Sequence, residues 1–476
     1  MIETASQEVE LQTNMKGFLF FWSGQIMSIL GSSIIQFVLT WWITVETESP
    51  LLLSLAMFVG FVPTVILTPI AGVFVDRWNK KALIGTVDFL QAAVTVVLVF
   101  LFRADNLNGS KIVTVPILLI FLAARGIFQA FHQPAVMALT PIMVPRKHLG
   151  RINSLDFFFN SIVFLIGPII AAFLFQLLPI HHLLWIDVAT FLIAVIPLIF
   201  IKIPTIQKDV IKGEVAVEKK KSFFIELKEG FSFIKEKKGL LALLSAFTGA
   251  NFFIMPLFTL INLFIYSTHA GGETNLAFVM AFNQAGTIAG SILFLLWKGF
   301  KKKVNGVVIG LFAMYIGFLI LAFTPIGWFW FMGLGFLITG FALPMANISS
   351  QTIWQSIVPK DMLGRVMSVR IAIASFAGPI GMILSGLLAN TIANIVSNHN
   401  SVFLADGIAI KYVFIGASII GLIFLAISWF FTSMRHVEKN IVVEEEKVED
   451  IGKTDDGLVE SLELIEKDSP STASSK

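Results

Sequence analysis

Two stretches of this chain are nearly identical: VPRKHLGRINS at Val144–Ser154 and VPKDMLGRVMS at Val358–Ser368. They share the pattern V-P-basic-x-x-L-G-R-[IV]-x-S and begin 214 residues apart (358 − 144 = 214). A second pair, Gly167-Pro168 and Gly378-Pro379, follows at almost the same spacing. Solenoid and propeller repeats are only about 20–50 residues long. The long period therefore indicates a duplicated domain.

The composition shows what kind of domain is duplicated. Hydrophobic residues make up 56% of the 476 residues and charged residues only 14%, whereas soluble domains are about 25% charged. Such a chain has too little polar surface to cover itself in water, so we expect lipid to be its solvent. The chain has no cysteine, which excludes disulfides and thiol chemistry.

Twelve apolar runs reach the length of about 20 residues that a bilayer-spanning helix needs. The predicted spans are Gly17–Val45, Leu51–Val75, Ala82–Phe102, Ile112–Pro134, Ser154–Leu178, Leu183–Ile201, Leu240–Ser267, Leu276–Trp297, Val304–Phe323, Trp328–Gln351, Val366–Ile392 and Ile408–Thr432. Pro and Gly inside them are tolerated because neighbouring helices satisfy the freed backbone groups. We predict an all-α membrane protein with twelve transmembrane helices.

Basic residues gather in alternate loops, which sets the orientation. The basic loops contain Arg77, Lys80, Lys81, Arg146, Lys147, Arg151, Lys298, Lys301, Lys302, Lys303, Lys360 and Arg365. Loops rich in Lys and Arg stay in the cytoplasm. We therefore expect a multi-pass protein of the plasma membrane with both termini cytoplasmic.

One long polar interruption divides the spans into six and six. We predict two pseudo-symmetric six-helix bundles, at residues 17–201 and 240–432, after a short cytoplasmic segment at 1–16. Two parallel repeats of six helices, related by an axis along the membrane normal, describe the major facilitator architecture.

The two remaining segments are polar. Residues 202–239 form a basic cytoplasmic linker with apolar residues at helical spacing: Phe223, Leu227, Phe231 and Ile234. This pattern is typical of an amphipathic helix on the membrane surface, or of an ordinary linker attracted to anionic lipid. Residues 433–476 are acidic and weakly apolar, so we predict a disordered cytoplasmic tail.

The loop GVFVDRWNKK at Gly72–Lys81 resembles the major facilitator signature G-x-x-x-D-R-x-G-[RK]-[RK], with Asn79 in place of the usual Gly. Over both halves, the chain resembles the macrolide-efflux group within the drug–proton antiporter branch. WSGQIMSILGSSIIQF at Trp22–Phe37 and FHQPAVMALTPIMVP at Phe131–Pro145 carry this resemblance. It implies export of amphipathic, drug-like compounds, macrolides among them, by alternating access and proton antiport.

The signature loop suggests a latch between the two halves. Asp76 lies at the cytoplasmic end of its helix, and the eleventh helix begins near Gly364-Arg365 with a partial positive charge at its N-terminus. We expect these groups to meet when the cavity opens outward. The predicted latch consists of Gly72, Asp76, Arg77, Lys80, Lys81, Gly364 and Arg365. Alternatively, the charges only orient the loop.

Arg125 lies in the middle of the fourth span, where a charge costs at least about 2.5–3.5 kcal/mol. It must face the bundle interior and find a partner there. In the drug–proton antiporters, a fourth-helix Arg is associated with proton coupling, and the alternative is a structural ion pair. The predicted proton-coupling residues are Arg125, Asp88, Asp156 and Asp187.

Weak polar stripes follow several spans at helical spacing. The predicted substrate-binding residues are Gln25, Ser32, Gln36, Gln129, Asn251, Asn262, Asn283, Asn347 and Gln351. Neutral amides among many Phe and Met residues suit a large amphipathic substrate. Pro kinks a helix, so we predict hinges at Gly167, Pro168, Gly378 and Pro379.

The sequence contains no nucleophile–base constellation, nucleotide-binding loop or metal-ligand spacing, so we expect no enzyme, no cofactor and no metal. The expected partners are a small amphipathic substrate, protons and membrane lipid, with no nucleic acid and a monomeric chain. Two alternatives remain: a siderophore or lysolipid transporter of the same fold, and a transporter-derived receptor or scaffold that signals through the acidic tail.

Overall fold

The computed structural model describes residues 15–108, 114–201, 223–297, 299–359, 362–397 and 402–438. Within these ranges the chain forms thirteen α-helices and two single turns, Phe264–Thr268 (η1) and Ser433–His436 (η2). Twelve helices are long and apolar enough to cross a membrane. The predicted all-α class and number of spans are therefore confirmed. Most of the predicted N-terminal segment, linker loop and acidic tail lie outside the described residues.

Each predicted span corresponds to one long helix. The first six are α1 (Met15–Thr47), α2 (Pro50–Arg77), α3 (Lys80–Asn108), α4 (Val115–Met143), α5 (Arg146–Leu177) and α6 (Ile180–Phe200). The second six are α8 (Lys238–Leu263), α9 (Glu273–Leu296), α10 (Lys303–Ala322), α11 (Phe329–Ile357), α12 (Leu363–Ser397) and α13 (Val402–Phe431). Several helices continue beyond their apolar runs. The helix α5, for example, begins directly after Pro145. Pro is favoured at a helix start, because an N–H group there would have no partner within the helix.

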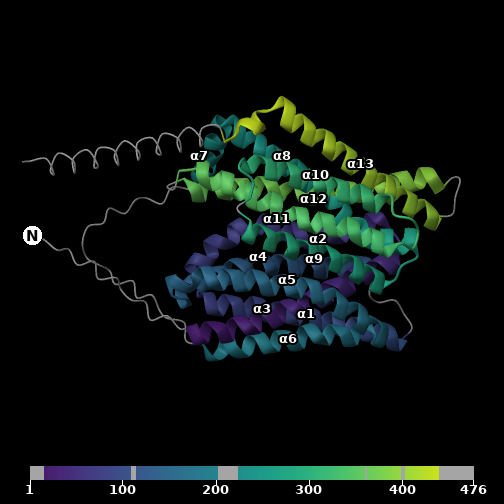
Figure 1. Ribbon diagram of the computed structural model, residues 1–476. Helices are drawn as coiled ribbons and strands as arrows, with labels where there is room; N and C mark the ends of the chain where they lie inside the picture. The colour runs from purple at the N-terminus through teal and green to yellow at the C-terminus, as the bar shows by residue number, and fades with distance from the viewer. Residues whose placement is uncertain are drawn as a thin grey trace, which may run out of the picture.

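The twelve helices form two side-by-side bundles, with α1–α6 below and most of α8–α13 above in Figure 1. The bundles meet mainly along two pairs, α2 with α12 and α5 with α9. In each pair, the second span of one half packs on the fifth span of the other. This reciprocal pairing is what a twofold pseudo-symmetry axis between the bundles produces.

The bundles touch each other at one end. We call the end at which α1 begins the terminal end (left in Figure 1) and the opposite one the far end. At the far end, Gln176 Nε2 of α5 donates to Thr274 Oγ1 of α9 at 2.6 Å. The Tyr266 hydroxyl of η1 donates to Glu48 Oε1, just after α1, at 3.1 Å. These bonds join the two halves across the far end.

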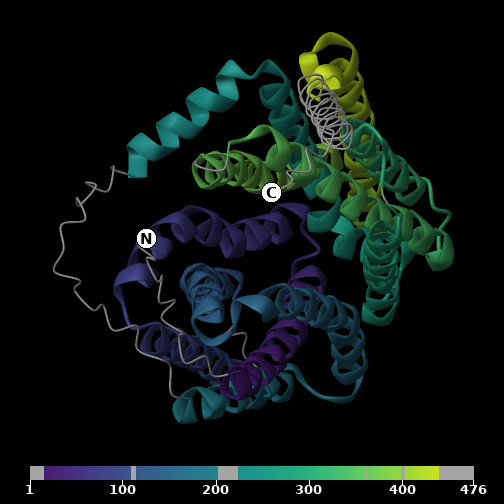
Figure 2. The ribbon, with the colours of Figure 1, turned by 60° about the vertical axis from the view of Figure 1, so that its left-hand side comes forward.

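Glycines on α2 and α12 show how the contact changes along the bundle. A Cβ added to Gly386, toward the far end of α12, would lie 2.3 Å from Ser54 Oγ of α2. At the terminal end, added Cβ atoms at Gly72 of α2 and Gly364 of α12 would meet nothing within 4 Å. The two helices are therefore in close contact toward the far end, whereas Gly72 and Gly364 face open space. Figure 2 shows the terminal end turned toward the viewer.

The helix α7 (Phe223–Glu236) lies in the segment where the sequence predicted an amphipathic helix. It packs against α12 and α8. Glu229 forms an ion pair with Arg365, Gly230 lies against the Arg365 backbone, and Ile234 is fully buried. Part of its apolar face is therefore covered by protein, whereas the sequence suggested only membrane lipid.

His269 stands directly after η1 at the far end and is 3% exposed. Its ring packs against Phe264 and Phe329, with centroids 4.9 and 6.1 Å away. The Gly327 backbone N–H donates to Nδ1 at 3.3 Å. Burial, and then the charge of Lys411, lower the pKa of His269 from 6.5 to about 4.

This pKa predicts an acid-sensitive far end. Between about pH 6.5 and 4 the unfolded chain binds a proton at His269 and the folded chain does not. The stability that His269 contributes is therefore complete above about pH 6.5 and decreases as the pH falls. From about pH 7 to 5 we expect the melting temperature to fall further in the wild type than in His269→Gln. Equal decreases would show that another group carries the pH dependence.

Candidate functional site

Arg125 projects from α4 into the interior of the first bundle. It lies ten residues after Val115, about 15 Å along the helix from the far end at 1.5 Å per residue. Its Nη1 donates to Asp187 Oδ2 and to Thr95 Oγ1, both at 2.8 Å. Its Nη2 donates to Ser32 Oγ at 3.4 Å. The Arg125 and Asp187 side chains are only 13% and 6% exposed, so the ion pair is buried.

Asp187 joins four helices through its carboxylate. Besides Arg125 of α4, it accepts hydrogen bonds from Thr95 of α3 at 2.8 Å and Ser32 of α1 at 3.1 Å. The close approach of α1 and α6 depends on Gly31, where an added Cβ would lie 1.9 Å from Thr190 Oγ1. The predicted proton-coupling residues Arg125 and Asp187 thus lie together, and the predicted substrate contact Ser32 belongs to the same network.

A second titratable pair lies nearer the terminal end. His132 Nε2 of α4 stands 2.9 Å from Asp88 Oδ1 of α3. Asp88 is 3% exposed, and within the described part of the chain its Oδ2 has no hydrogen-bond partner. His132 and Arg125 are seven residues apart and share one face of α4. The first bundle therefore holds two pairs of ionisable groups, one after the other along α4.

The second bundle contains a partly buried cation that the sequence analysis missed. Arg370 Nη1 of α12 donates to Gln351 Oε1 of α11 at 2.6 Å, and its Nη2 donates to Ser350 Oγ at 3.2 Å. The guanidinium also lies over the rings of Phe247 and Trp354, 5.9 and 5.4 Å from their centroids. No carboxylate among the described residues lies within ion-pair distance of it.

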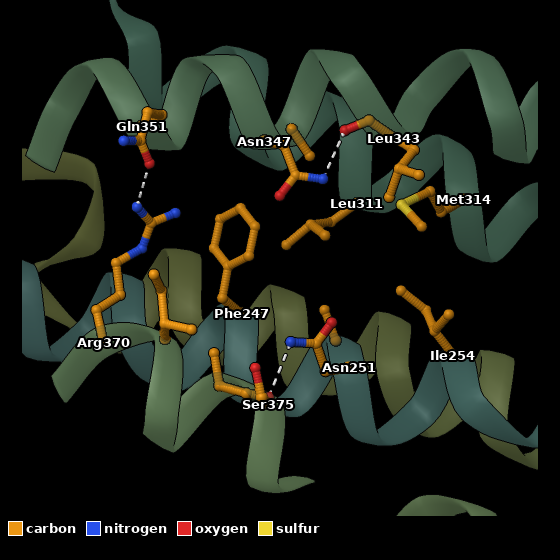
Figure 3. Close-up of a pocket in the computed structure, with 14 residues that line it drawn as sticks. Phe247, Asn251, Ile254, Leu311, Met314, Leu343, Asn347, Gln351, Arg370 and Ser375 are labelled. Carbon is orange, nitrogen blue, oxygen red and sulfur yellow. Dashed lines mark hydrogen bonds between the residues drawn. The ribbon is translucent and has the colours of Figure 1, made fainter. Parts of the chain in front are cut away.

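Arg370 borders a cavity of about 200 Å³ between α8, α10, α11 and α12. In Figure 3, Arg370 and Gln351 lie at one end, and Leu343, Met314 and Ile254 lie at the other. The cavity is therefore charged at one end and apolar at the other.

The predicted substrate-binding residues divide between several places. Asn251, Asn347 and Gln351 line the cavity. Asn251 Nδ2 donates to the Ala374 carbonyl at 2.9 Å, and Asn347 Nδ2 donates to the Leu343 carbonyl at 3.1 Å. Three of the five polar residues predicted in the second bundle thus line one cavity.

The other predicted contacts lie outside this cavity. Gln36 Nε2 donates to Thr40 Oγ1 at 3.2 Å along α1. Asn283 Nδ2 of α9 donates to the Phe336 carbonyl of α11 at 3.2 Å. Gln25 and Asn262 are buried, whereas Gln129 is exposed. Substrate contact by these residues stays a prediction.

The predicted latch residues are separated in this state. Arg365 pairs with Glu229 of α7. Lys81 Nζ donates to the carbonyls of Ile199 and Ile201 at 2.9 and 2.7 Å, at the end of α6. Lys80 begins α3, and the Asp76 and Arg77 side chains lie outside the described residues. Since the latch was expected with the cavity open outward, it stays a prediction.

Asp156 and the predicted hinges lie on α5 and α12. Asp156 is exposed and accepts a hydrogen bond from Trp22 Nε1 at 2.9 Å. Pro168 and Pro379 stand inside α5 and α12. An added Cβ would lie 2.5 Å from Ser33 Oγ at Gly167, but 3.5 Å from its nearest neighbour at Gly378. The hinge pair therefore differs in packing, and hinge motion stays a prediction.

Two bundles of six apolar helices with a buried ion pair in one and a cavity in the other are typical of a polytopic membrane transporter. A model of the Major Facilitator Superfamily matches residues 21–382 and again 300–467. The chain belongs to the Major Facilitator Superfamily. Because this family consists of transporters, the expectation that the chain is not an enzyme is confirmed.

Named relatives extend this assignment. The chain is 30% identical to Macrolide efflux protein A of Streptococcus pyogenes over 376 residues, which are 79% of this chain and 90% of the relative. It is 28% identical to Macrolide efflux protein A of Enterococcus faecalis over 335 residues, 70% of this chain and 99% of the relative. The predicted resemblance to macrolide-efflux proteins is therefore confirmed.

A solved structure shows the same fold. It is a bacterial homologue of the human lysosomal transporter Spinster, in an inward-facing and unoccupied conformation. The TM-score is 0.68 at 15% identity, over 89% of this chain and 97% of the other.

Proposed function

We propose that the protein exports amphipathic, drug-like compounds, macrolides among them, from the cytoplasm by alternating access coupled to inward proton movement. The observation that supports it best is the buried Arg125–Asp187 pair, which ties four helices of one bundle together. Intramembrane charges of this kind mark ion pathways and proton relays.

The basic residues support the direction of opening. Lys80, Lys81 and Lys301–Lys303 lie at the terminal end, and loops rich in Lys and Arg stay in the cytoplasm. The terminal end is therefore the cytoplasmic one, and both termini are cytoplasmic. On this orientation the described state is inward-facing, because its halves are joined at the far end.

Protonation of the Asp187 carboxylate would change how the helices around it pack. A proton on its carboxylate cancels the charge that holds Arg125 and weakens the hydrogen bonds from Ser32 and Thr95. The contacts among α1, α3, α4 and α6 then change together. Asp88 and His132, nearer the cytoplasm, are placed to pass the proton on.

Everted membrane vesicles test this function, because export appears there as uptake. We expect vesicles with the protein to take up a radiolabelled macrolide when respiration acidifies their interior, and to lose it on addition of a protonophore. Vesicles without the protein are the control. Uptake that is insensitive to the protonophore would contradict the coupling. Uptake of only a siderophore or a lysophospholipid would favour the alternative cargo.

A tail deletion at residue 439 separates transport from signalling. If the shortened chain exports as much as the wild type, the tail is not needed for transport. A scaffold role would then not replace transport. Loss of a cellular response without loss of export would favour a signalling role.

A further inference from the structure

Arg370 differs from the two other partly buried arginines whose side chains the structure describes. Arg125 is paired with Asp187, and Arg365 with Glu229. Arg370 has only neutral partners. A charge taken out of water is costly unless an opposite charge compensates it. The position therefore lacks its compensating anion.

The guanidinium also keeps donors for that anion. Arginine carries five N–H donors, and the contacts to Gln351, Ser350 and the Met367 sulfur use three of them. Two donors are left over among the described residues. The rings of Phe247 and Trp354 lie beside the guanidinium, with their centroids 5.9 and 5.4 Å from Cζ. A guanidinium group can bind a carboxylate or phosphate with two parallel hydrogen bonds.

The duplication does not account for this arginine. Arg370 stands five residues after Arg365 in the second copy of the repeat, and the residue at the same distance after Arg151 in the first copy is Asp156. The equivalent positions thus carry opposite charges. Arg370 is a property of the second bundle and its cavity.

The shape of the cavity completes the description of the ligand. Beyond Arg370 and Gln351, it continues between apolar side chains: Ile254, Leu311, Met314 and Leu343. A molecule with an anionic group at one end and an apolar body matches both ends. A basic amine at the Arg370 end meets a like charge in a medium of low dielectric constant, which weakens its binding.

We infer that Arg370 and this cavity bind the oxyanion of amphipathic ligands, a carboxylate or phosphate group attached to an apolar body. The inference rests on the proposed export function, to which it adds anionic amphiphiles as a class of substrate separate from the macrolides. The anion supplies the missing counter-charge, while the apolar part lies against α8, α10 and α11.

The test uses the full chain in nanodiscs of neutral lipid and a matched set of fluorescent probes: 1-pyrenebutyrate, 1-pyrenebutanol and 1-pyrenebutylamine. Binding is measured by fluorescence anisotropy without a proton gradient. We expect the wild type to bind the carboxylate at least about tenfold more tightly than the alcohol, and the amine most weakly. Equal affinities, or preference for the amine, would overturn the inference even before any substitution is made.

Variants then assign the preference to Arg370. We expect Arg370→Gln to weaken pyrenebutyrate binding about tenfold or more and pyrenebutanol binding less than about twofold. Arg370→Lys keeps the charge without the planar edge and should lose only part of the preference. Thr391→Ala, in the same helix but outside the cavity, is the control and should alter neither affinity. An unchanged preference in folded Arg370→Gln would place the anion site elsewhere.

Competition identifies the source of the anion. Displacement of pyrenebutyrate by lysophosphatidate but not by lysophosphatidylcholine indicates a lipid phosphate, and displacement by free fatty acid alone indicates a carboxylate. Displacement by neither would overturn the inference. Because binding is measured without a gradient, absence of macrolide export would count against the proposed function alone, and absence of anion preference against the inference alone.

Discussion

Replacing Arg125 with alanine is expected to abolish proton-dependent export and to destabilise the first bundle. The substitution leaves Asp187 buried with only Ser32 and Thr95 as partners. Removing one member of a buried ion pair costs about 3–5 kcal/mol, because the other charge stays uncompensated. Export in everted vesicles and the melting temperature of the purified protein measure the two effects.

A double variant separates coupling from stability. Replacing both charges with apolar residues is often neutral for stability, so Arg125→Leu with Asp187→Leu should recover most of the lost melting temperature. We expect this variant to remain unable to use the proton gradient. Thr95→Val, which removes the hydrogen bonds of one hydroxyl to Asp187 and Arg125 but no charge, is the control and should cost about 1.5–3 kcal/mol. Wild-type proton dependence in the double variant would make the pair a structural element.

Gly386→Leu is expected to prevent the far end from closing and to reduce export at least about tenfold. Even the Cβ atom of a side chain at this position would lie 2.3 Å from Ser54 Oγ and 2.8 Å from the Pro50 carbonyl oxygen of α2. The backbone carbonyl cannot turn away as a side chain can. Because the packed helices have no space to absorb the new atoms, α12 must move away from α2.

Crosslinking between α5 and α9 reports this movement at a separate contact. The chain has no cysteine of its own, so Gln176→Cys and Thr274→Cys, which replace residues bonded at 2.6 Å, add the only pair. We expect this pair to crosslink readily in the otherwise native chain and poorly with Gly386→Leu. Gly416→Leu in α13, where an added Cβ meets nothing within 4 Å, should leave crosslinking unchanged. Undiminished crosslinking in Gly386→Leu would contradict closure through α2 and α12.

Much of the fold was predictable because lipid imposes a simple rule on the sequence. Each span must be apolar over the thickness of the bilayer, so the twelve runs and the division after residue 201 could be read directly. The docking of α7 on α12 could not be predicted from the sequence. Its apolar spacing does not distinguish lipid from protein as the covering surface, and the Glu229–Arg365 pair depends on the position of a helix outside the bilayer.

The site was predictable in part. Because a charge inside the membrane is costly, Arg125 was predicted to have a partner in the bundle interior. Asp187 was among the candidate acids. The two residues lie ten and seven positions after the starts of α4 and α6, which both begin at the far end, so their similar depth could be counted. The rotation of each helix about its own axis could not be predicted from the sequence. Arg370 lies only four residues after the start of a predicted span (370 − 366 = 4), so the mid-span criterion that selected Arg125 did not select it.

The contact between the halves at the far end also has a pharmacological consequence. On the proposed orientation, a blocker dissolved in the external medium meets the rim formed by Glu48, Tyr266, Gln176 and Thr274 and not the interior. A compound that occupies the Arg370 cavity in this state must first cross the bilayer. Esters of carboxylic acids, which permeate as neutral molecules and are hydrolysed inside the cell, are therefore better starting points for inhibitors than the free acids.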